Sequence, residues 1–198
     1  RSSLEAHLDI YLDKETLSKV EGVAFDEISI TSSFKVHLLD SNSDGFAITA
    51  EIPAPISASS VEMEEKIDLL KGYVHAVNVT DNPGATAHMS SLAGCNIVRN
   101  KGIDPIFQVT CRDRNRLAIQ SDLMGASALG INNVLTLAGD PIKNGDQADA
   151  KAVFDINSKK ILSIMQSMND DGQTMSGREL QTRSKFFPAG AAIIHEPE

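Results

Sequence analysis

Residues 105–138 read PIFQVTCRDRNRLAIQSDLMGASALGINNVLTLA, and this stretch decides the fold class. Its two ends, residues 105–110 and 133–138, are short apolar runs typical of buried strands. Residues 114–129 between them have the length of a helix, and Gly130 follows as a C-terminal cap. A strand, a helix and a second strand in this order predict two parallel strands joined by a right-handed crossover.

The same alternation extends over residues 46–198. We expect strands at residues 46–52, 74–80, 105–110, 133–138 and 186–193, and helices at 61–71, 87–100, 114–129 and 156–168. Two α/β architectures fit this pattern. A five-stranded doubly wound sheet would be complete at this length, whereas a (β/α)8 barrel typically takes ~250 residues. The alternation by itself therefore favours the doubly wound sheet.

Residues 1–44 lack this alternation, and we treat them as an N-terminal appendage to a domain of residues 45–198. Apolar residues at Ile28, Ile30, Phe34, Val36 and Leu38 alternate with polar ones, which is typical of a half-buried strand or strand pair. The turn-forming segment SNSDG at 41–45 predicts the boundary.

Composition excludes several classes of function. The 198-residue chain has a formal net charge of −9, 5% aromatic residues and no Trp, which argues against nucleic-acid binding. No apolar run approaches the ~20 residues of a membrane-spanning helix. The two cysteines, Cys95 and Cys111, cannot form a disulfide framework, and no Cys/His cluster has zinc spacing. We expect a cytoplasmic protein with reduced thiols that binds neither nucleic acid, membrane nor metal.

Polar side chains recur where the expected strands end. They are Glu51, Thr80, Thr110 with Cys111, and Asp140, which follows Gly139. Ligand sites of parallel α/β folds form at the carboxyl ends of strands, and in a barrel several strands contribute. Within ITAEIPAP, apolar residues and prolines flank Glu51, so we expect it to be partly desolvated. Desolvation favours the protonated form and suits a general acid, although a surface Glu at a strand end is the alternative.

The other polar residues also have purely structural interpretations. The hydroxyls of Thr80 and Thr110 are expected to satisfy nearby backbone groups. In CRDRN, residues 111–115, Asp113 or Asn115 can cap the following helix while both arginines stay solvated. The loop AGDPIKNGD, residues 138–146, matches neither a P-loop nor GxGxxG and has the composition of an ordinary turn.

The segment QVTCRDRNRLAIQSDLMGASALGINNVLTLAGDP, residues 108–141, resembles the central signature of the methylenetetrahydrofolate reductase family. It is particularly similar to the branch that includes the reductase half of bifunctional homocysteine methyltransferase/reductase proteins. The continuation KNGDQADAKAVFDINSKKIL, residues 143–162, resembles this branch too. AITAEIPAP (47–55) and VNVTDNPGA (77–85) resemble the first two barrel strands. The resemblance covers roughly residues 46–198.

The resemblance implies a (β/α)8 barrel with about five of its eight βα units present, which reverses the preference for a doubly wound sheet. It implies reduction of 5,10-methylenetetrahydrofolate to 5-methyltetrahydrofolate in one-carbon and methionine metabolism, with FAD as cofactor and NAD(P)H as reductant. Five strands leave a barrel open. The chain is therefore expected to be a fragment, or a homo-oligomer or partner subunit completes the barrel.

The resemblance also assigns site residues. Glu51 would be the acid that protonates N10 of the folate, and the negative charge of Asp140 would favour the cationic intermediate. The cofactor-binding residues would be Thr80, Asp81, Gln108, Ala138, Gly139 and Asp140. Many relatives have His in place of Gln108 and Arg or Thr in place of Ala138. These departures and the missing units leave open a non-catalytic, partner-dependent binding subunit, and the pattern alone leaves open a flavodoxin-like binding module.

Overall fold

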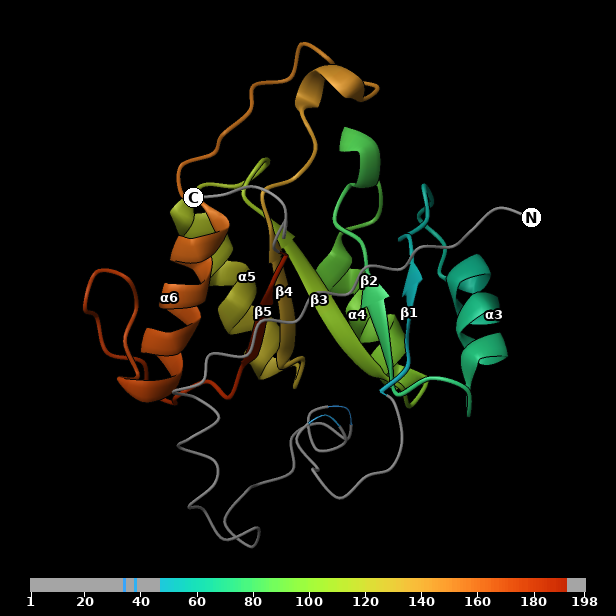
Figure 1. Ribbon diagram of the computed structural model, residues 1–198, viewed down its shortest axis with the longest axis horizontal. Helices are drawn as coiled ribbons and strands as arrows, with labels where there is room; N and C mark the ends of the chain where they lie inside the picture. The colour runs from blue at the N-terminus through green and yellow to red at the C-terminus, as the bar shows by residue number, and fades with distance from the viewer. Residues whose placement is uncertain (1–33, 35–37, 39–46, 192–198) are drawn as a thin grey trace, which may run out of the picture.

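The computed structural model describes residues 34, 38 and 47–191, which form a parallel β-sheet with helices packed on it (Figure 1). Five strands lie side by side in the order of the chain: β1 (Thr49–Ile52), β2 (Ala76–Val79), β3 (Asp104–Thr110), β4 (Asn133–Leu137) and β5 (Phe187–Gly190). Every neighbouring pair is parallel. Within the described residues, β1 pairs only with β2 and β5 only with β4.

The α-helices of the described region all pack on one face of this sheet. They are α3 (Val61–Leu70), α4 (Ser91–Asn100), α5 (Arg116–Ala128) and α6 (Ser158–Asp170). Side chains alternate between the two faces of a strand, so Val77, Phe107 and Val134 share the main core with residues of all four helices. None of the helices in the described region has the length and apolarity to cross a membrane.

The sequential strand order and one-sided helices are those of a barrel segment. A doubly wound sheet has a shuffled strand order and helices on both faces. The preference that the alternation alone gave to that architecture is therefore wrong, because alternation carries no information on strand order. The barrel-type fold expected from the resemblance is confirmed, with five strands in the described part.

The helix ends follow local capping chemistry. Asn115 caps α5, because its Oδ1 accepts from the backbone N–H groups of Leu117 and Ala118. After α5, Gly130 adopts a positive φ of 72° and donates its N–H to Ser127, as the sequence predicts. Helix α4 begins later than predicted, since Ser90 caps it and accepts from the N–H of Ala93.

The inner face of the sheet, away from the helices, is filled near its amino end by Phe34. Phe34 and Leu38 have helical backbone conformation, so the strand predicted for these two positions is wrong; the other residues of that prediction lie outside the described region. Phe34 is 2% exposed and packs with Ala76, Ile106 and Leu135. The carboxyl end of the inner face is left for polar side chains.

Gly94 provides a test of how closely α4 packs on the sheet. A Cβ at Gly94 would lie 2.8 Å from Cγ1 of buried Val79 and 3.2 Å from Cε of Met63. We predict that Gly94→Ala lowers the free energy of unfolding by about 1–3 kcal/mol, measured by urea denaturation, because the core must shift. Gly125→Ala is the control. It would meet only Leu92 Cδ2 at 3.7 Å and should gain about 0.5–1 kcal/mol from helix propensity. Equal effects of both variants would contradict the packing.

Candidate functional site

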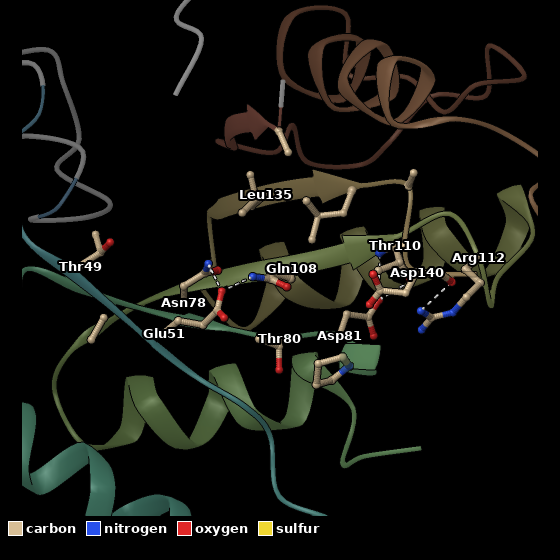
Figure 2. Close-up of a pocket in the computed structure, with 16 residues that line it drawn as sticks. Thr49, Glu51, Asn78, Thr80, Asp81, Gln108, Thr110, Arg112, Leu135 and Asp140 are labelled. Carbon is tan, nitrogen blue, oxygen red and sulfur yellow. Dashed lines mark hydrogen bonds between the residues drawn. The ribbon is translucent and has the colours of Figure 1, made fainter. Parts of the chain in front are cut away.

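A cavity of about 970 Å³ lies at the carboxyl end of the inner face (Figure 2). This volume is at the upper end of the range for cofactor and small-molecule sites. Every site residue named from the resemblance lines it: Glu51, Thr80, Asp81, Gln108, Ala138, Gly139 and Asp140. The sheet thus brings together residues that are up to 89 positions apart in the sequence, counted from Glu51 to Asp140.

Two side-chain amides orient Glu51. Nε2 of Gln108 donates to Glu51 Oε2 at 3.0 Å, and Nδ2 of Asn78 donates to the same oxygen at 3.2 Å (Figure 2). Within the described region Oε1 has no hydrogen-bond partner. The prediction that Glu51 is desolvated is wrong, because the residue is exposed. Strand alternation directs the neighbouring Ile52 into the core and leaves Glu51 on the open inner face.

Two buried polar atoms, one in β2 and one in the residue directly after it, have no hydrogen-bond partner in the described region. They are Oδ1 of Asn78 and the hydroxyl of Thr80, and both residues line the cavity. Asn78 is 5% exposed and Thr80 is 6% exposed. The expectation that the Thr80 hydroxyl satisfies nearby backbone is wrong. An unsatisfied buried polar group costs about 1–3 kcal/mol, so both atoms favour a polar ligand.

Asp81 is the acceptor of a buried ion pair. Its carboxylate accepts hydrogen bonds from Nη1 and Nη2 of Arg114 at 2.6 and 2.9 Å. It also accepts hydrogen bonds from the backbone N–H and the hydroxyl of Thr110, each at 2.9 Å. The hydrogen bonds to Asp81 raise the pKa of Arg114, whereas burial raises the pKa of the neighbouring Asp122. The Thr110 hydroxyl therefore binds a side chain, so the expectation that it bonds nearby backbone groups is wrong. The expectation that Arg114 is solvated is wrong too.

Arg112 is 1% exposed, so the expectation that it is solvated is also wrong. Its Nε and Nη2 donate to the two carboxylate oxygens of Asp113 at 2.8 and 2.7 Å. These bonds raise the pKa of Arg112 and lower that of Asp113. The sequence offered a signal for the Asp81–Arg114 pair, since Asp81 follows one expected strand and CRDRN, with Arg114, follows the next.

The loop after β4 is more specific than an ordinary turn. Oδ2 of Asp140 accepts the N–H of Gly84 at 2.9 Å, and the residue is exposed. Gly139 has a φ of 94°, and a Cβ there would lie 3.0 Å from Cβ of Arg112. Glycine is therefore required at 139. Ala138 can offer a ligand only its methyl group and its backbone.

In the part of the chain that the structure describes, no group of three or more His, Cys, Asp or Glu residues is arranged to hold a metal ion. The polar side chains that line the cavity are carboxylates, amides and hydroxyls together with the guanidinium of Arg112. The arrangement can accept and donate hydrogen bonds to an organic ligand, and Glu51 can exchange a proton through its unbonded oxygen.

Comparison with known proteins gives two matches. One similar protein is "Methylenetetrahydrofolate reductase 1" of Schizosaccharomyces pombe, which is 26% identical over 122 residues. That alignment covers 60% of this chain and 20% of the relative, so it spans about a fifth of the relative's length. The model of the methylenetetrahydrofolate reductase family matches residues 37–188, which contain β1 to β4, the first two residues of β5 and the cavity residues from Glu51 to Asp140. The chain belongs to the methylenetetrahydrofolate reductase family.

Proposed function

We propose that this chain forms the flavin and folate site of an enzyme that reduces 5,10-methylenetetrahydrofolate to 5-methyltetrahydrofolate. The observation that carries the proposal is the cavity in which Glu51, Gln108 and Asp140 converge from three strand ends. Membership of the reductase family supports it. FAD would be the bound cofactor and NAD(P)H the source of electrons.

The chemistry of the cavity fits a flavin ring. The ring has both N–H and C=O groups on its edge, and Asn78 Oδ1 and the Thr80 hydroxyl are buried without partners. Thr80, Gln108 and the backbone of Ala138–Gly139 would hold the cofactor. When bound, FAD would supply the hydride that reduces the methylene carbon.

Glu51 would supply the proton. The amides of Asn78 and Gln108 both bind Oε2, which leaves Oε1 as the oxygen that can carry a proton to the substrate. A general acid must reach the atom it protonates, and the exposed position of Glu51 in the cavity permits this.

Asp140 would act through its charge. The N–H of Gly84 donates to one of its carboxylate oxygens, and the other oxygen has no hydrogen bond within the described region. A carboxylate fixed at the rim of the cavity stabilises positive charge that develops on the bound substrate. Asp140 need not exchange a proton for this role.

Glu51→Gln tests the acid assignment, because the amide keeps the shape and cannot donate the required proton. We predict that folate reduction falls by about 10²-fold or more, while retention of FAD and flavin reduction by NAD(P)H stay within twofold. Stopped-flow absorbance separates the two half-reactions. Glu62→Gln on the outer surface of α3, where Glu62 pairs with Lys66 at 2.7 Å, should change neither. Equal loss of both half-reactions in Glu51→Gln would exclude the acid role.

Thr80→Val tests whether the unpartnered hydroxyl meets the cofactor. We predict a rise of about 3- to 10-fold in the Kd for FAD, since one hydrogen bond contributes about 0.5–1.5 kcal/mol. The FAD-free protein should not lose stability, because the hydroxyl has no partner there. Thr136→Val removes a buried hydroxyl that lies outside the cavity and donates to the carbonyl of Ser158 at 3.5 Å, so it is the control for loss of a hydroxyl and should leave the Kd unchanged. Fluorescence titration measures the Kd, and an unchanged value for Thr80→Val would refute the contact.

A further inference from the structure

A single buried guanidinium joins the three loops that follow β2, β3 and β4. Besides its two bonds to Asp113, Arg112 donates from Nη2 to the main-chain carbonyl of Asn82 at 3.0 Å. Its Nη1 donates to the main-chain carbonyl of Asp140 at 3.3 Å (Figure 2). Arginine can do this because its planar group presents five N–H donors in fixed directions.

The loop after β2 is shaped to meet Arg112. Asn82 has a left-handed φ of 48°, which is uncommon for residues other than glycine. Its Nδ2 donates to Oδ2 of Asp113 at 3.1 Å, and its Oδ1 accepts the N–H of His88 at 3.0 Å. These bonds hold the turn in the conformation that presents the carbonyl of Asn82 to the guanidinium.

Asp140 is consequently held at two points. Arg112 binds its main-chain carbonyl, and the N–H of Gly84, two residues beyond Asn82, binds its carboxylate at 2.9 Å. Gly139 lies close to the side chain of Arg112, since a Cβ there would be 3.0 Å from Cβ of Arg112 and 3.2 Å from Cβ of Thr110, which is tighter than an ordinary contact. The loops after β2 and β4 therefore depend on the same side chain for their relative position.

The charge of Arg112 is directed away from the carboxylate of Asp140. Its two ion-pair bonds go to Asp113, and only a carbonyl of Asp140 is bound. Asp81 and Asp140 act on Arg112 only through longer-range attraction. Asp140 thus keeps an exposed carboxylate with one oxygen free of hydrogen bonds in the described region.

We propose that Arg112 is a positioning residue that fixes the carboxylate of Asp140 at the cavity through main-chain carbonyls and leaves its negative charge unpaired. The catalytic consequence rests on the proposed function, whereas the positioning itself does not.

The positioning is tested by amide hydrogen exchange of Arg112→Lys in the absence of FAD. Lysine keeps the charge but has one donor centre, so it cannot bind all three loops. We expect the non-proline amides of residues 82–86 and 138–142 to exchange about 10-fold faster, with no change in the buried amides of α5 and α6. Arg116→Lys is the control, because Arg116 pairs with Asp155 at 2.7 Å outside this cavity and should leave both segments unchanged. Wild-type exchange in both segments of Arg112→Lys would overturn the proposal.

Should Arg112→Lys fail to fold, Asp113→Asn is the second variant, because it leaves Arg112 in place and changes the carboxylate that binds its guanidinium. It weakens the two bonds that fix Nε and Nη2 and removes the paired charge. Asp113→Asn also disturbs the bond from Asn82 Nδ2, so the diagnostic segment is residues 138–142. That segment is then expected to lose protection, and unchanged exchange there would again contradict the proposal.

A double-mutant cycle tests the link to Asp140. We expect Arg112→Lys to lower kcat of folate reduction about 10-fold, with KM and flavin reduction nearly unchanged. In an Asp140→Asn background the same substitution should cost nothing further, because its effect acts through that carboxylate. If the fold-losses in kcat of the two single variants multiply in the double variant, Arg112 acts independently of Asp140. That result would overturn the proposed link between the two residues. A wild-type protein without folate reduction would refute the proposed function, and the exchange result would still decide the positioning role.

Discussion

The structure depends on one constraint, which is that all helices of the described region pack on a single face of a sequentially ordered parallel sheet. None of the four helices α3 to α6 covers the opposite face, so the side chains that alternate onto it must find other partners. Near the amino ends they are apolar and pack with Phe34. Near the carboxyl ends they are polar, and they satisfy one another only in part. The remaining unsatisfied atoms, in Asn78 and Thr80, mark where a polar ligand would find hydrogen-bond partners.

Two ion pairs divide the carboxylates of this region into structural and functional groups. Asp81 and Asp113 are paired with Arg114 and Arg112. The side chains of Arg112 and Asp81 are each 1% exposed, so removing the partner of either would leave a buried charge uncompensated, at a typical cost of about 3–5 kcal/mol. Glu51 and Asp140 receive only neutral amide donors and stay exposed. The same segment, residues 111–115, therefore organises the loops without neutralising the two carboxylates that face the cavity.

Elements with local causes could be predicted from the sequence, and contacts between distant residues could not. The strands near 105 and 133 and the caps Asn115 and Gly130 follow from periodicity and local bonding. Strand order does not, because both architectures share the same alternation. The burial of Arg112 was missed, since two of its three partners, Asn82 and Asp140, lie in loops that meet only after folding. The polar residues at the strand ends already placed Glu51 and Asp140 at one edge of the sheet, and the family resemblance assigned them their roles.

The central claim is that the carboxyl end of the uncovered face binds a flavin that serves folate reduction. The visible absorption spectrum of the purified protein, recorded before and after addition of FAD and gel filtration, tests this most directly. The account predicts a flavin band that is retained through gel filtration, is bleached by NAD(P)H and returns when methylenetetrahydrofolate is added. A protein that retains no flavin after incubation with excess FAD would contradict it.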